Sequence, residues 1–162
     1  MMFIWRPRAG TKKYNAKDLW RKGEKLVRKG KVQEAEDVFQ EAANSSSPLD
    51  RHYAYVKLIR LYGKQIGEGQ DRLQDLICVC QQDIELFPEF YEAWMVEYLN
   101  NIPTPYFPSF AVLAQIYEDQ GNVEEAIALC ELALGYGLSE TISEDYAEKL
   151  ERLYAKKDTG GH

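Results

Sequence analysis

Few residues in this sequence have the types and spacing that catalysis or metal binding requires. His52 and His162 are its only histidines, and no Ser-His-Asp set, phosphate-binding loop or zinc-ligand spacing is present. Cys78 and Cys80 lie two positions apart on an expected helix, so they face different ways and indicate buried structural thiols. The Gly-Glu-Gly stretch at 67–69 lacks the context of a dinucleotide-binding fingerprint. The sequence therefore predicts no catalytic, cofactor-binding or metal-binding residues, and no enzyme.

The three cysteines and the absence of long apolar runs indicate where in the cell the protein is located. An odd cysteine count without framework spacing favours free thiols in a reducing environment. No apolar run approaches the roughly 20 residues that a membrane span needs. The apolar stretch near the start is too short for a secretory signal. We therefore expect a cytoplasmic protein with no transmembrane segment.

The charge is distributed unevenly along the 162 residues, whose net charge is −6. Residues 1–31 hold eleven Lys and Arg residues and two acids, whereas residues 73–148 hold fifteen acids and no Lys or Arg. Such asymmetry is informative about partners. The basic segment could bind nucleic acid or an anionic membrane, with Trp5 or Trp20 stacking on bases. It could instead pair with the acidic half of its own or a neighbouring chain, which would give a homo-oligomer. The acidic remainder of the chain disfavours nucleic acid.

Apolar residues recur at helical spacing through most of the chain, which predicts an all-α fold. A glycine-rich loop is expected at 63–69, the end of a helix at Pro88, and a break in helical structure at 101–108, where three prolines occur. A capping box at residues 141–144 is expected to begin the last helix, with Tyr146, Leu150, Leu153 and Tyr154 on its inner face. The expected helices span 16–29, 32–44, 49–62, 71–87, 89–100, about 107–120, 123–133 and 141–157.

Six positions of the first helix pair recur later in the chain at a constant offset of 91 residues. Gly23, Gly30, Val32, Ala35, Phe39 and Ala42 correspond to Ala114, Gly121, Val123, Ala126, Cys130 and Ala133. This pattern of small, turn and aromatic positions resembles the tetratricopeptide repeat, a helix–turn–helix unit of about 34 residues. The resemblance covers residues 16–157 and implies a short right-handed α-solenoid: three full repeats, a stray helix at 89–100 and a C-terminal capping helix. Residues 1–15 would form a basic extension, and 158–162 a frayed tail.

The resemblance also implies a concave surface lined by the first helix of each repeat, where a protein segment could bind. Chaperone-binding members hold a carboxylate with Lys and Asn, but the corresponding positions here are Trp20 and Glu24, which excludes that role. Tyr106 and Phe107 are expected to be packing aromatics. The function that we expect is a non-enzymatic scaffold or adaptor, and the alternatives are polyanion binding through residues 1–31 or self-assembly. The residues expected to bind the partner are Lys17, Trp20, Arg28, Tyr53, Arg60, Lys64 and Met95.

Overall fold

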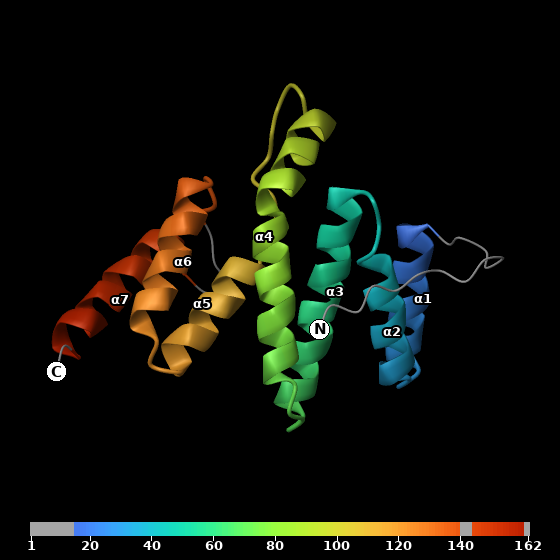
Figure 1. The fold of residues 1–162 in the computed structure, drawn as a ribbon, viewed down its shortest axis with the longest axis horizontal. Helices are drawn as coiled ribbons and strands as arrows, with labels where there is room; N and C mark the ends of the chain where they lie inside the picture. Colours follow the sequence, from blue (N-terminus) through green and yellow to red (C-terminus); the bar gives the residue numbers. More distant parts are fainter. Residues whose placement is uncertain (1–14, 140–143, 161–162) are drawn as a thin grey trace.

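The computed structural model describes residues 15–139 and 144–160 of the chain. In these ranges the regular secondary structure is helical, which confirms the all-α prediction. Of the expected N-terminal extension, only Asn15 lies inside the described residues. The helices lie side by side in chain order (Figure 1). They are α1 (Ala16–Arg28), α2 (Val32–Ala42), α3 (Pro48–Gly67), α4 (Leu73–Glu97), α5 (Ser109–Asp119), α6 (Val123–Gly135) and α7 (Tyr146–Thr159).

Each described helix packs against the next one along the chain, and α1 also contacts α3. The buried apolar side chains follow this order. One cluster joins α1, α2 and α3, a second joins α2, α3, α4 and α5, and a third joins α4, α5, α6 and α7. The core therefore extends along the whole row of helices.

The turns inside three helix pairs have the same local geometry. Gly30, Gly69 and Gly121 have φ values of 76°, 87° and 80°, in the left-handed region that glycine adopts without strain. In each turn, the backbone amide of the residue after this glycine donates to the carbonyl of the residue five positions before the donor. The bonds are Lys31 to Leu26 (2.9 Å), Gln70 to Gln65 (2.9 Å) and Asn122 to Tyr117 (2.8 Å). This is the pattern of a Schellman helix end. The predicted turns at Gly30 and Gly121 are confirmed.

The expected loop at 63–69 is wrong, because α3 continues through Gly63 and ends at Gly67. A glycine inside an exposed helix position costs only about 1 kcal/mol. The last turns of α3 offset that cost, since Leu61, Tyr62 and Gln65 are buried there. The connection that follows spans residues 68–72, two residues more than the connections of the other two pairs.

The expected helix end at Pro88 is also wrong, because α4 runs without interruption from Leu73 to Glu97. A proline inside a helix removes one backbone hydrogen bond and crowds the carbonyl four residues earlier. Phe87, Phe90 and Trp94 lie on both sides of Pro88 at helical spacing, and all three are buried in one cluster. Their burial outweighs the local cost. The predicted helix at 89–100 is therefore the end of α4, and the prolines of 101–108 come after it, as predicted.

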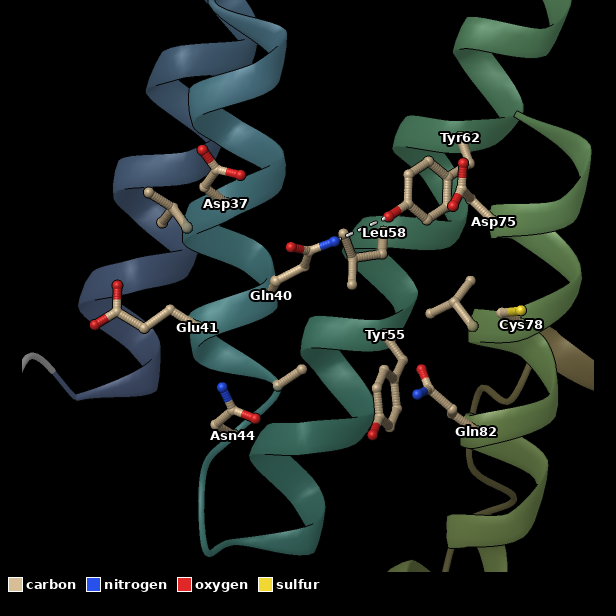
Figure 2. A pocket seen from close by; sticks show the side chains of 13 residues that line it. Asp37, Gln40, Glu41, Asn44, Tyr55, Leu58, Tyr62, Asp75, Cys78 and Gln82 are labelled. Carbon is tan, nitrogen blue, oxygen red and sulfur yellow. Dashed lines mark hydrogen bonds between the residues drawn. The ribbon is translucent and has the colours of Figure 1, made fainter. Parts of the chain in front are cut away.

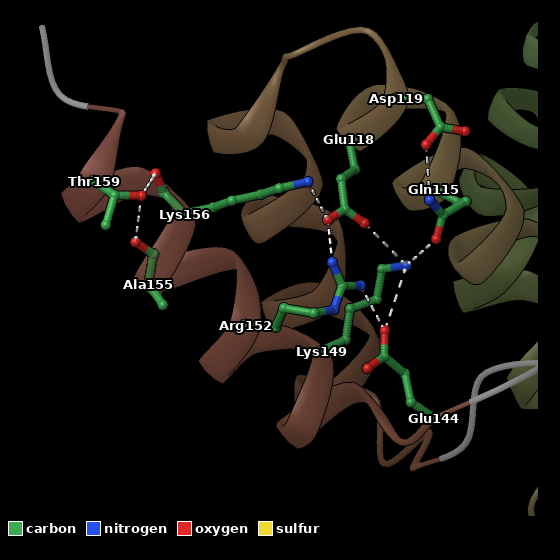
Figure 3. Close-up of polar contacts among 9 residues, drawn as sticks. All are labelled: Gln115, Glu118, Asp119, Glu144, Lys149, Arg152, Ala155, Lys156 and Thr159. Carbon is green, nitrogen blue, oxygen red and sulfur yellow. Dashed lines mark hydrogen bonds and ion pairs between the residues drawn. The ribbon is translucent and has the colours of Figure 1, made fainter.

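The last helix, α7, packs against α6, and buried charges join it to α5 (Figure 3). The carboxylate of Glu118 is buried and accepts hydrogen bonds from Arg152 and Lys156. Lys149 donates to Gln115 Oε1 at 2.8 Å. Burial alone would raise the pKa of Glu118, but the hydrogen bonds and charges of Arg152 and Lys156 outweigh it and lower the pKa to about 2.

The start and inner face of α7 differ in part from the prediction. The side chain of Asp145 caps the helix by accepting from the Glu148 amide at 2.7 Å, while residues 141–143 of the predicted capping box lie outside the described residues. Tyr154, expected on the inner face, is exposed. Tyr146, Leu150 and Leu153 are buried as predicted.

Two glycine substitutions test the packing of α1 and the continuity of α3. A Cβ atom on Gly23 would lie 2.3 Å from Phe39 Cε1, so Gly23→Ala should lower the free energy of unfolding by about 1–3 kcal/mol. A Cβ atom on Gly63 meets nothing within 4 Å, so Gly63→Ala should raise it by about 0.5–1 kcal/mol. Urea titration followed by circular dichroism measures both. A destabilising Gly63→Ala would contradict a helix at that position.

Because of the Glu118 network, the free energy of unfolding should depend on pH in the acidic range. The pKa of Glu118 is lower in the folded state than its ordinary value of 4.5, so the carboxylate stabilises the fold above that value. This contribution should be lost as pH falls from about 4.5 towards about 2. Glu118→Gln should lower stability at neutral pH and flatten the loss on acidification, whereas the exposed Glu92→Gln should do neither. Urea titrations over this pH range would contradict the network if the two variants gave the same slope.

Candidate interaction surfaces

The residues predicted to bind a partner come from three helices, and the structure brings only some of them together. Trp20 of α1 packs edge-on against Tyr53 of α3, with ring centroids 5.5 Å apart. Arg60 of α3 lies over the ring of Tyr106, 6.0 Å from its centroid, at the limit of a cation–π contact. The remaining predicted residues are all exposed: Lys17 and Arg28 on α1, Lys64 on α3, and Met95 on α4.

Tyr53 also links this face to the end of α4. Burial, followed by the nearby Tyr98, Asp50 and Glu97, raises the pKa of the Tyr53 phenol above its ordinary value. Lys57 of α3 pairs with Glu24 of α1 between the two helices. The outer face of α1 and α3 and the end of α4 therefore form one surface.

The end of α4 and the segment after it expose a group of large apolar side chains. In Figure 1 this end of α4 extends beyond its neighbours. Leu99 is 77 % exposed, Val96 69 % and Tyr106 59 %. We call this group the α4 patch: Met95, Val96, Tyr98, Leu99, Ile102 and Tyr106. Of these residues only Met95 is among those predicted to bind a partner, because the sequence predicts a separate helix at 89–100 and a packing role for Tyr106.

The proline segment (residues 101–108) is fixed to the helices by buried contacts. Trp94 Nε1 donates to Pro103 O at 2.8 Å. Phe107 is buried and stacks on His52, with centroids 4.2 Å apart. Phe107 is therefore a packing aromatic, as predicted, but Tyr106 is not. The side chains of the α4 patch are therefore exposed, while buried contacts of Trp94 and Phe107 hold the backbone beside them in place.

His52 and Asp83 form a fully buried pair beneath this segment. His52 Nδ1 lies 2.8 Å from Asp83 Oδ1, and His52 Nε2 lies 2.9 Å from the carbonyl oxygen of Tyr106. A carbonyl cannot donate, so Nε2 carries a hydrogen and one more proton is shared between Nδ1 and Asp83. Burial raises the pKa of Asp83, and the hydrogen bond and charge of His52, with the hydroxyl of Ser109, act against this rise.

No sequence pattern predicts that His52, Asp83 and Ser109 meet, since they lie on three different helices. Their arrangement does not provide a base for acyl transfer, because Nε2 already donates to Tyr106. Among the described residues, neither Ser109 Oγ nor Asp83 Oδ2 has a hydrogen-bond partner of regular geometry. The pair instead joins α3 and α4 to the proline segment.

A groove lies on the opposite face of α3. Tyr55, Leu58 and Tyr62 line it, and at 100° per residue they point away from the side of α3 that carries Tyr53 and Arg60. Its volume is about 740 Å³, with walls from α2 and α4 (Figure 2). We call it the α2–α4 groove. Its lining residues are Asp37, Val38, Gln40, Glu41, Ala43, Asn44, Tyr55, Leu58, Tyr62, Asp75, Cys78, Val79 and Gln82.

The cysteines and acids of the described residues do not gather at a metal site. In residues 15–139 and 144–160, no group of three or more His, Cys, Asp or Glu side chains is placed to hold a metal ion. Cys80 and Cys130 are buried, but Cys78, also expected to be buried, is exposed. In the same ranges no helix has the length and apolar character needed to cross a membrane.

The His52–Asp83 pair predicts a large difference between two variants. His52→Leu leaves a buried carboxylate without a partner and should lower the free energy of unfolding by about 3–5 kcal/mol. Asp83→Asn keeps a hydrogen bond to a neutral imidazole, so it should cost no more than about 0.5–1.5 kcal/mol. Denaturant unfolding measures both. Equal losses would show that the contact contributes through its volume alone.

The chain was compared with protein-family models, with curated proteins and with solved structures. No protein-family model, no curated protein and no solved structure matches this chain. The features that bear on its function are therefore the α4 patch, the α2–α4 groove and the helices that position them.

Proposed function

We propose that this chain is a protein-interaction module, a scaffold or adaptor, that binds a protein segment on the surface formed by α1, α3 and the end of α4. The α4 patch carries the proposal. Six large apolar side chains are exposed within twelve residues. Contiguous exposed apolar surface of this kind marks sites where proteins associate.

The chemistry around the patch fits a peptide-like partner. Aromatic side chains and arginine are good anchors at protein interfaces. Trp20, Tyr53 and Arg60 border the patch on one side, with Tyr98 and Tyr106 between them and its apolar end. A partner segment would place apolar side chains on Leu99 and Val96 and meet the aromatic rings beside them. The surface offers hydrogen-bonding and charged groups at its edge and apolar contact at its centre.

The helix arrangement supports an assignment as a tetratricopeptide-type solenoid. The three helix pairs share one turn geometry, and neighbouring helices pack in chain order. On this proposal α1, α3 and α5 are the first helices of successive units, and α7 caps the array. The predicted binding residues then lie on first helices, except Met95, which belongs to the extended α4. The unbonded thiols fit a cytoplasmic location.

A paired-variant capture experiment tests the proposed function. The tagged full chain is incubated with native lysate, with and without nuclease, and bound proteins are quantified by mass spectrometry. Recovery of a discrete bound protein should not change when nuclease is added. The same recovery should fall about tenfold for the variant Val96→Ser plus Leu99→Ser, because these two side chains are the most exposed anchors of the patch. Leu132→Ser plus Leu134→Ser on α6, an exposed apolar pair away from the patch, is the matched control and should leave recovery unchanged.

Three results would contradict the proposal. Equal recovery with both double variants would remove the α4 patch from the interaction. Recovery of nucleic acid, with every protein lost after nuclease, would favour polyanion binding through residues 1–31. Recovery of untagged copies of the chain alone would favour self-assembly.

A further inference from the structure

The α2–α4 groove is separate from the proposed interaction surface, since the two lie on opposite faces of α3. We propose that this groove binds a short, extended protein segment that carries Arg or Lys at alternate positions. The site would be a second interaction surface, selective for basic segments. Its shape, its charges and its floor each support this partner.

The shape of the groove fits a few residues of extended chain. The lining comes from three stretches of matching length: residues 37–44 at the end of α2 and just after it, 55–62 of α3 and 75–82 of α4. Eight helical residues cover about 10 Å at 1.5 Å per residue. An extended chain covers that length in about three residues. The groove is therefore long enough for two basic side chains and the residue between them.

The charges on the rim of the groove fit that spacing. Asp37 and Glu41 lie one helical turn apart on α2, which places their Cβ atoms about 5–6 Å apart. Alternate side chains of an extended segment lie on one face, about 7 Å apart. Within the described residues neither carboxylate forms an ion pair, whereas Asp75 on the opposite wall is paired with Arg72 at 3.0 Å. The lining has no Lys or Arg. The α2 rim therefore offers two uncompensated negative charges at the spacing of alternate basic residues.

The floor and inner walls of the groove fit the rest of such a segment. Leu58 and Val79, which pack in one cluster, form an apolar floor on which the aliphatic stems of Arg or Lys can lie while their charged ends reach the rim. Figure 2 shows the Gln82 side chain in the groove beside Tyr55. The amides of Gln82 and Asn44 make no side-chain hydrogen bond to the described residues, so they are able to bond a partner's backbone. Gln40 is already engaged with Glu36 and Tyr62.

Cys78 provides a direct readout of occupancy, because it lines the groove and is exposed. Cys80 and Cys130 are buried, and burial raises the pKa of both thiols, so an alkylating reagent should label Cys78 first. The full chain is treated with a maleimide while a capped peptide, Ala-Leu-Arg-Ala-Arg-Leu-Ala, is titrated in. Labelling should slow at least fivefold at saturating peptide. A peptide with Glu in place of both arginines should give no protection.

Matched variants assign the effect to the rim. The double variant Asp37→Asn plus Glu41→Gln should lower the affinity for the protecting peptide about fivefold, as expected for the loss of two exposed ion pairs. Glu92→Gln plus Glu125→Gln changes the net charge equally at exposed sites outside the groove and should leave the affinity unchanged. Val96→Ser plus Leu99→Ser should also leave it unchanged, which separates this site from the proposed function. Absence of protection, or equal weakening by both charge variants, would overturn the proposal.

Discussion

The packing of Phe107 is the contact on which the middle of this structure depends. Its ring meets those of His52, Phe87, Phe90 and Phe110, with centroids 4.2 to 5.6 Å away. These rings come from α3, α4 and α5, so one side chain of the proline segment joins the second helix pair to the third. Aromatic pairs contribute about 0.5–1.5 kcal/mol each beyond their buried area. With the hydrogen bonds that Trp94 and His52 make to the backbone of this segment, this anchor fixes the route of the chain from α4 to α5.

The same anchor explains how an apolar patch can be presented at the end of α4. Phe87, Phe90 and Trp94 keep α4 helical past Pro88 by burying one continuous stripe. Trp94 then holds the returning chain at Pro103. Among the described residues, no further helix covers the stretch between these fixed points. The α4 patch is therefore exposed although its backbone is held at both ends.

Local sequence signals predicted the parts of the fold that local physics determines. Gly30 and Gly121 mark turns that need a left-handed residue, and the helices on both sides follow from apolar periodicity. Gly63 and Pro88 were misread because their local preferences are overridden by burial at Tyr62 and Phe90, which depends on distant partners. The binding residues were predicted from repeat phase, so Trp20 and Tyr53 were found together while Leu99 and Tyr106 were not recognised as a patch. The α2–α4 groove had no sequence signal, since three separate stretches build it.

The charge network of α7 has a consequence for how partners approach the molecule. Lys149, Arg152 and Lys156 are the first cations after Arg72 along the chain, and all three are engaged with Glu118 or its neighbours. They compensate a buried acid, while the acids of residues 73–148, some of them paired with Arg51, Arg72 or Lys157, still outnumber the nearby cations. The field over that half of the molecule is negative, and such fields raise the association rates of oppositely charged partners. At physiological ionic strength the attraction extends about 8 Å from the surface, so it orients a basic segment before contact is made.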